Sequence, residues 1–419
     1  MKQFLIGAAT AAHQVEGNNI YSDFWKQEQM VHSNFKEPSL DAVDHYHRFK
    51  EDIDLMVNAK MNAYRFSIEW SRIEPEKGKF DQQEINHYRE VLKYCIENNI
   101  QPIVTLHHFS SPAWLIQEGG WASEMVVDYF NRYAMYVVDE LHEYLEYICT
   151  INEANMGLQI HKKISKMMQD NGVDLQVGIN LSSLVSQEVK EENLQVFHSE
   201  NPVTFLSPRD EKSDEIVMQT HCKCRESIKK KYPNLQVGLT LSLHDFQVID
   251  GGEKLADKEW DVEFKHYVPY IKNDDFIGVQ NYTRNIVSKD GIIKPNEDAR
   301  LTTSGYEFYP QALGNVIRKV SKALSIPILV TENGISTNDD TERIEFIKEV
   351  LVGVKECINE GIVVLGYLHW SLLDNFEWNR GYEMRFGLID VDRNTQTRKP
   401  KPSLKYVVER CSALHLGDK

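Results

Sequence analysis

The sequence is poor in positive charge and has no long apolar run, and both absences limit what the protein can bind. Its 419 residues include 47 Lys and Arg against 63 Asp and Glu, which gives a net charge of −16. Nucleic acids and anionic lipids are bound by basic surfaces. No stretch reaches the roughly 18 apolar residues that a transmembrane helix needs. The sequence therefore predicts neither a nucleic-acid partner nor a membrane partner.

Cysteine is also scarce, with six residues in the whole chain. Cys149 lies in an apolar run and is expected to be a buried apolar side chain. The cluster His221-Cys222-Lys223-Cys224 has metal-ligand residue types, but no second Cys/His pair has a matching spacing, so we expect no metal site. Residues 1–7 contain no signal-peptide hydrophobic region. The small number of cysteines and the lack of a signal-peptide pattern in residues 1–7 predict a cytoplasmic protein with reduced cysteines.

Eight short apolar runs recur along the chain. They span residues 4–8, 63–68, 102–107, 147–151, 237–243, 276–279, 328–330 and 363–368. Segments with apolar residues at helical spacing, such as 81–98 and 342–360, lie between them. Eight buried strands alternating with helices predict an α/β protein with a parallel sheet closed into a (β/α)₈ TIM barrel.

The longest interval without a predicted strand is about 156–236. Within it, residues 187–214 are polar and weakly periodic, so we expect a loop over the barrel mouth. No linker, repeat or low-complexity tract marks a second domain. The sequence therefore predicts one catalytic domain, residues 1–419, with an atypical long loop region at about 156–236.

Two glutamates stand where predicted strands end. Glu153 follows the fourth strand and Glu332 follows the seventh, so in an eight-stranded barrel they face each other across the mouth. Two facing carboxyls are the equipment for cleaving a glycosidic bond. A gap of about 5–5.5 Å would retain the anomeric configuration, whereas roughly 6.5–9.5 Å would invert it. Other polar residues at strand ends are Gln14, Glu16, Arg65, His107, His108, Asn152, Gln280, Asn281, Tyr282 and Asn333.

The surroundings of the two glutamates suggest different roles. Arg65 would favour the charged form of a nearby carboxyl, and Tyr282 could donate a hydrogen bond to the same group. We assign that carboxylate to Glu332 as the nucleophile. Glu153 must then hold a proton in the resting enzyme, so we expect it in an apolar or like-charged setting.

Several motifs resemble those of glycoside hydrolase family 1, the β-glucosidase family. Thr150-Ile151-Asn152-Glu153 resembles its acid/base motif, and Thr331-Glu332-Asn333-Gly334 resembles its nucleophile motif. Residues 4–17, 64–73, 370–378 and 385–388 resemble its other signature stretches. The resemblance covers nearly the whole chain except about 156–236.

The resemblance implies a retaining β-glycosidase with Glu332 as nucleophile and Glu153 as acid/base, and without a metal or organic cofactor. It implies that Arg65 and Tyr282 tune the nucleophile and that Asn152 binds the sugar 2-hydroxyl. The other substrate-binding residues that it implies are Gln14, His108, Trp370, Glu377, Trp378 and Phe386, with Trp370 as the apolar floor of the sugar site.

The chain departs from the family pattern in three places. Ala154 stands where the family has proline, and Gln280-Asn281-Tyr282 stands where it has Asn-Tyr-Tyr. The stretch with Gly-Tyr and Ala-Pro-Gly that usually follows strand four is missing. We therefore expect an unusual aglycone side of the site.

The predicted function is that of an exo-acting β-glucosidase on small β-glycosides, with galactosides and fucosides as open alternatives. A carboxylate at Glu377 argues against 6-phosphoglycosides, because phosphate is bound by cationic and N–H groups. Transglycosylation and a catalytically silent sugar-binding barrel are the other hypotheses. Trp114 and Trp121 could line the pocket rim or the core, and the chain could be a monomer or a homo-oligomer.

Overall fold

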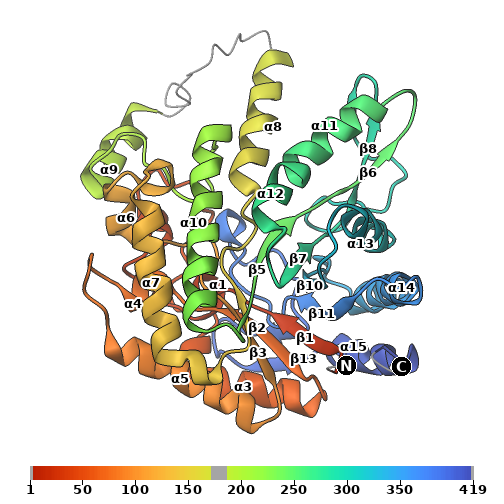
Figure 1. Cartoon of the computed structure of the whole chain (residues 1–419), viewed down its shortest axis with the longest axis horizontal. Helices are drawn as coiled ribbons and strands as arrows, with labels where there is room; N and C mark the ends of the chain where they lie inside the picture. Colours follow the sequence, from red (N-terminus) through yellow and green to blue (C-terminus); the bar gives the residue numbers. More distant parts are fainter. Residues whose placement is uncertain (1–2, 171–185, 417–419) are drawn as a thin grey trace.

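The computed structural model describes residues 3–170 and 186–416, and its centre is a closed barrel of eight parallel strands (Figure 1). Around the barrel the order is β1-β11-β10-β7-β5-β4-β3-β2. The strands are β1 (Leu5–Ala9), β2 (Ala63–Ser67), β3 (Gln101–Thr105), β4 (Tyr147–Cys149), β5 (Gln236–Ser242), β7 (Phe276–Gln280), β10 (Ile328–Glu332) and β11 (Val364–Trp370). Each predicted apolar run forms one of them, so the predicted TIM barrel is confirmed.

Helices pack around the outside of this barrel (Figure 1). Among the longer ones are α3 (His45–Asn58), α5 (Gln82–Glu97), α7 (Val126–Leu141), α10 (Glu211–Lys231), α11 (Glu253–Glu263), α13 (Ala312–Ala323), α14 (Asp340–Asn359) and α15 (Pro402–Ala413). The helices predicted at 81–98 and 342–360 are α5 and α14. Each begins after an aspartate, Asp81 or Asp339, whose side chain accepts hydrogen bonds from backbone N–H groups of the first turn.

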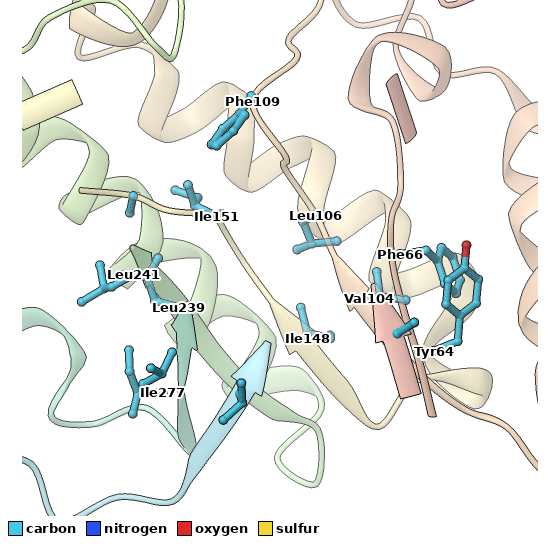
Figure 2. Packing of buried hydrophobic residues seen from close by; sticks show 14 of the residues in the cluster. Tyr64, Phe66, Val104, Leu106, Phe109, Ile148, Ile151, Leu239, Leu241 and Ile277 are labelled. Atoms are coloured by element: carbon cyan, nitrogen blue, oxygen red, sulfur yellow. The ribbon is translucent and has the colours of Figure 1, made fainter. Parts of the chain in front are cut away.

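The strands are buried on both faces, which explains their nearly continuous apolar sequence. Side chains such as Val104, Ile148 and Ile277 belong to the large core cluster of the protein (Figure 2). A second, smaller buried cluster contains Leu5, Ala63, Ile103, Tyr147, Cys149, Phe276, Leu329 and Leu368. The expected burial of Cys149 is confirmed.

The interpretation of residues 187–214 as a loop is wrong for its first part and for residues 211–214, which are helical. The interval after β4 holds α8 (Met156–Asp170), then α9 (Gln187–Phe197), then α10. Ser186 accepts a hydrogen bond from the Val189 N–H and so caps α9, and straight-chain helix formers fill this helix. Helix α9 has weak periodicity because it buries only Phe197. Residues 171–185 of the predicted loop region lie outside the described residues.

Two small sheets accompany the barrel. Strands β6 (Asp245–Val248), β8 (Arg284–Ser288) and β9 (Gly291–Ile293) form one, and β12 (Ile389–Val391) pairs with β13 (Arg398–Pro400). In the parts of the chain that the structure describes, no helix has the length and apolar character needed to cross a bilayer.

Candidate active site

Glu332 lies at the end of β10 with both carboxyl oxygens held. An Arg65 guanidinium nitrogen donates to Glu332 Oε1 at 2.7 Å, and the Tyr282 hydroxyl donates to Glu332 Oε2 at 2.6 Å. Arg65 projects from β2 and is fully buried, so its charge acts in a medium of low dielectric. Tyr282 therefore reaches Glu332 although Gln280 and Asn281 depart from the family pattern. The two donors stabilise the ionised form of Glu332.

Asn152 is oriented by three donors to one oxygen. Its Oδ1 accepts from Arg65 Nη2 at 2.6 Å, from Gln280 Nε2 at 2.8 Å and from the Thr240 hydroxyl at 3.1 Å. This fixes the amide so that Asn152 Nδ2 points to His108 Nε2, 3.1 Å away. The network joins residues that lie in, or just after, five barrel strands: β2, β3, β4, β5 and β7.

His108 is held neutral in a defined tautomer. Burial lowers the pKa of His108 well below its usual value, and the charge of Arg65 adds to the effect. Because Asn152 Nδ2 is a donor, His108 Nε2 accepts and the proton lies on Nδ1. Among the described residues His108 Nδ1 has no partner, so this N–H can donate to a bound molecule.

Glu153 lies in the turn after β4 and is almost fully buried. Burial and, next, the charge of Glu332 raise the pKa of Glu153 to about 8, while a hydrogen bond from Ser242 opposes the rise. Burial also raises the pKa of Glu332, but Arg65 and Tyr282 oppose it. Glu332 therefore ionises first, and the proton that the pair retains near neutral pH lies on Glu153.

Gln14 and Glu377 form a polar wall beside the two carboxyls. Gln14 Nε2 donates to the Phe376 carbonyl at 2.8 Å and to Glu377 Oε2 at 3.2 Å. Gln14 Oε1 is buried and has no partner within the described part of the chain, so it can accept from a bound molecule. Burial and the charge of Glu332 raise the pKa of Glu377 to about 8, with Gln14 opposing.

Aromatic rings supply the apolar surface of the site. Trp370 lies at the end of β11 and stacks on His108 with ring centroids 5.6 Å apart. Phe386 packs with Trp370 in a small apolar cluster that Tyr282 adjoins. Trp378 stacks on His13 at 5.8 Å. Flat apolar faces next to hydrogen-bonding groups suit a pyranose ring, which has an apolar face and polar edges.

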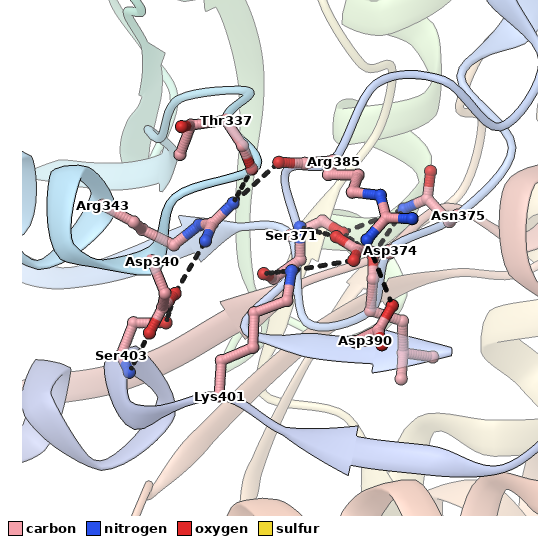
Figure 3. A network of polar contacts seen from close by, with 12 residues as sticks. Thr337, Asp340, Arg343, Ser371, Asp374, Asn375, Arg385, Asp390, Lys401 and Ser403 are labelled. Atoms are coloured by element: carbon pink, nitrogen blue, oxygen red, sulfur yellow. Dashed lines mark hydrogen bonds and ion pairs between the residues drawn. The ribbon is translucent and has the colours of Figure 1, made fainter. Parts of the chain in front are cut away.

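A network of charges holds the loop that carries Glu377 (Figure 3). Lys401 Nζ donates to Asp374 Oδ2 at 2.7 Å, and the Gly387 N–H donates to Asp374 Oδ1 at 2.8 Å. Asn375 Nδ2 donates to the Ser371 hydroxyl at 2.9 Å, and its Oδ1 accepts from Gln14 Nε2 at 3.2 Å. The loop is thus tied to Gln14 near one end of the chain and to Gly387 and Lys401 near the other.

Some polar residues at strand ends lie outside the site. Glu16 pairs with Arg72 at 2.8 Å, so it belongs to a separate polar cluster. His107 packs on Trp121 in the core, with ring centroids 4.6 Å apart. Trp114 and Trp121 are also core residues, since both are buried.

The sequence did not identify the two threonines that hydrogen-bond to the site residues and orient them. Thr240 donates to Asn152 and accepts from the Glu153 backbone N–H at 2.9 Å. Thr105 accepts from Arg65 Nε at 3.0 Å. Threonine is common in strands, so neither residue carries a signal that separates a site residue from an ordinary strand residue. Only the register of neighbouring strands identifies them.

The chain is similar to known glycosidases over nearly its full length. The sequence pattern described as Glycosyl hydrolase family 1 matches residues 1–201 and 251–413. A solved structure described as beta-glycosidase BGL167 is 38% identical, with a TM-score of 0.89 over 100% of this chain and 98% of that chain. Beta-glucosidase A of Acetivibrio thermocellus is 28% identical and covers 96% of both chains. The 6-phospho-beta-galactosidase of Clostridium acetobutylicum is 27% identical over 96% of this chain and 94% of its own.

Proposed function

Because this chain belongs to glycosyl hydrolase family 1 and is a glycoside hydrolase, we propose that it removes single sugars from the non-reducing ends of small β-glycosides, with β-glucosides preferred. The observation that carries the proposal is the difference between two neighbouring carboxyls. Glu332 accepts from Arg65 and Tyr282, whereas Glu153 has a pKa raised to about 8. This is the pairing of a nucleophile with an acid.

In the proposed first step, the ionised Glu332 attacks the anomeric carbon while Glu153 gives its proton to the glycosidic oxygen. The C–O bond to the aglycone breaks, the aglycone leaves as an alcohol, and a glycosyl ester forms on Glu332. In the second step, Glu153 as a carboxylate takes a proton from water, whose oxygen attacks the same carbon and frees Glu332. Two inversions give net retention.

Two polar atoms that lack a partner among the described residues, together with Glu377, suggest how the sugar is held. We assign His108 Nδ1–H as a donor, and Gln14 Oε1 with the Glu377 carboxyl as acceptors, for sugar hydroxyls. Asn152 is assigned to the 2-hydroxyl. Trp370, Trp378 and Phe386 are assigned to the apolar faces of the ring and its rim.

Glu377 favours substrates without phosphate. Burial and the negative charge of Glu332 raise its pKa, and a phosphate dianion beside Glu377 would be repelled by that same charge on Glu332. A phosphorylated sugar is therefore a poorer fit than the neutral sugar, although two relatives are described as a 6-phospho-beta-galactosidase and an aryl-phospho-beta-D-glucosidase. The split between hydrolysis and transglycosylation depends on the acceptor, and product analysis at high alcohol concentration measures it.

A panel of 4-nitrophenyl β-glycosides tests the substrate assignment. We expect the glucoside to have the highest kcat/KM and its 6-phosphate the lowest. NMR of the first product formed should show the β-anomer. An α-anomer as the first product, or a preference for the 6-phosphate, would contradict the proposal.

Variants of the two glutamates test their roles. Glu332→Gln should abolish turnover without lowering the Tm. Glu153→Ala should keep activity on 2,4-dinitrophenyl β-glucoside. Azide should accelerate this variant by replacing water in the second step, and the product should then be the β-glucosyl azide. Turnover by Glu332→Gln, or no azide effect on Glu153→Ala, would reject these roles.

We also propose that the protein acts in the cytoplasm. Supporting this, all six cysteines are unpaired and five of them are buried, as in proteins that do not depend on disulfides. Its oligomeric state, monomer or homo-oligomer, can be measured by light scattering.

A further inference from the structure

The turn that carries Glu153 has a backbone conformation that needs support. Glu153 has φ 43°, in the left-handed region that residues with a Cβ seldom adopt. Such conformations persist where the surroundings fix them. On the N–H side of the turn, Glu153 N donates to the Thr240 hydroxyl at 2.9 Å and Ala154 N donates to the Thr240 carbonyl at 3.1 Å.

The carbonyl side of the turn is held by a buried arginine. Arg209 Nη2 donates to the Ala154 carbonyl at 2.8 Å. The same guanidinium donates through Nη1 to the Phe205 carbonyl and lies 3.4 Å from Asp214 Oδ1 through Nε. Two backbone carbonyls and the Asp214 carboxylate therefore fix the position of the guanidinium. We propose that Arg209 is a positioning residue that aims the Glu153 carboxyl at the glycosidic oxygen by clamping the Ala154 carbonyl.

The clamp lies where this chain differs from its family. Proline, which Ala154 replaces, would fix the backbone φ after the acid/base residue, and alanine does not. The family pattern matches up to residue 201 and resumes at 251, so Arg209 lies outside the match. A hydrogen bond from Arg209 thus supplies a restraint that the turn sequence itself lacks.

Gly157 makes room for the clamp. A Cβ added at Gly157 would lie 2.4 Å from Arg209 Cζ and 2.6 Å from its Nη1. The Gly157 carbonyl also accepts from the Arg209 backbone N–H at 3.0 Å. Glycine is disfavoured inside helices, and Gly157 lies in the first turn of α8. The guanidinium explains its presence there.

The segment that carries Arg209 packs on a row of aromatic residues that reaches Trp378. Phe205 is fully buried and packs on His107, with ring centroids 4.8 Å apart, and on Phe109 at 5.8 Å. Phe109 in turn contacts Trp378 at 5.2 Å. The guanidinium of Arg209 lies 4.7 Å from the Phe205 ring. The clamp is therefore connected through Phe205 and Phe109 to Trp378, which is assigned to the sugar.

The proposal rests on the proposed function, and leaving-group dependence tests it. A general acid matters most when the departing alcohol is a poor leaving group. Arg209→Met should therefore lower kcat/KM for methyl β-glucoside by about 30-fold, because small misplacements of a catalytic group are costly. For 2,4-dinitrophenyl β-glucoside, which needs little protonation, the loss should stay below about 3-fold.

Two further variants separate the clamp from a general structural role. Gly157→Ala should displace the guanidinium and produce the same selective loss, although alanine suits a helix better than glycine. Arg225→Met is the matched control, since Arg225 is a buried arginine of α10 that pairs with Asp274 at 2.6 Å and, among the described residues, makes no hydrogen bond to the turn that carries Glu153. It should leave the ratio between the two substrates at the wild-type value.

Each outcome counts for or against the clamp. A selective loss in Arg209→Met and Gly157→Ala, but not in Arg225→Met, supports it. Provided that the wild type cleaves both glucosides, two results would overturn the clamp. One is an equal loss of activity on both substrates, and the other is no loss in Arg209→Met and Gly157→Ala. If Arg209→Met does not fold, the ratio of kcat/KM between the two glucosides is measured in Gly157→Ala and Arg209→Lys instead, and a selective loss on methyl β-glucoside again supports the clamp. A wild type that cleaves neither substrate would instead reject the proposed function.

Discussion

Removing one hydroxyl, in Tyr282→Phe, should shift the pH dependence of catalysis in a defined direction. The Tyr282 hydroxyl donates to Glu332 Oε2 at 2.6 Å and stabilises the carboxylate, so it lowers the pKa of Glu332. In the proposed mechanism, the active free enzyme has Glu332 ionised and Glu153 protonated. The acidic limb of the kcat/KM profile therefore reports protonation of Glu332, and losing the donor must move this limb to higher pH.

The size of the shift follows from the strength of the bond. A hydrogen bond to a charged group contributes about 1.5–3 kcal/mol. Each pH unit of pKa change corresponds to about 1.36 kcal/mol, so the acidic limb should move up by about one to two pH units. The Arg65 contact at 2.7 Å remains and keeps Glu332 the more acidic of the pair.

The assay is kcat/KM for 4-nitrophenyl β-glucoside measured across pH for Tyr282→Phe and for a matched control. Tyr133→Phe removes a buried hydroxyl that donates to the Ile68 and Leu106 carbonyls at 3.0 and 2.9 Å, away from the carboxyls. It should lower the Tm and leave the limb in place. An unmoved limb in Tyr282→Phe, or an equal shift in Tyr133→Phe, would refute the reasoning.

Three further expectations concern other parts of the site. Wild-type kcat/KM should fall as the pH rises through about 8, where Glu153 loses its proton, and this basic limb should vanish in Glu153→Ala with the dinitrophenyl substrate. Lys401→Met leaves the Asp374 carboxyl without its ion-pair partner, which should cost about 3 kcal/mol in the free energy of unfolding and raise KM; an unchanged urea midpoint would contradict this. Gln14→Leu removes the proposed acceptor for the sugar and the donor to Glu377. At about 1.5 kcal/mol for each of these two hydrogen bonds, kcat/KM should fall about 100-fold, and a fall of less than 3-fold would reject the assignment.

The sequence was sufficient to predict the strands and the residues at their ends. A strand buried on both faces must be apolar throughout, so its polar terminal residue stands out, as Glu332 does after Val330. Two such residues on facing strands, Glu153 and Glu332, follow from strand count alone. These positions depend on local sequence and on a fold with fixed geometry.

The residues that the sequence could not identify act through distant partners. Arg209 lies in a polar stretch and is indistinguishable from a solvated arginine, yet it is fully buried against the Ala154 carbonyl. Helix α9 buries a single side chain, so it has no apolar stripe for periodicity to detect. Thr240 looks like any strand residue until the pairing of β4 with β5 brings it beside Glu153.

The pairing of β1 with β11 has a consequence for synthesis in the cell. Leu5 pairs with Gly366, so β1 cannot pair along this edge until about 360 further residues have been synthesised. At about 5–20 residues per second, the ribosome leaves this sheet edge open for roughly 20 to 70 seconds. Open edges and unburied strand faces are where nascent chains associate with one another. We therefore expect slowed translation or chaperone depletion to reduce the yield of this protein more than that of a protein whose neighbouring strands follow one another in sequence.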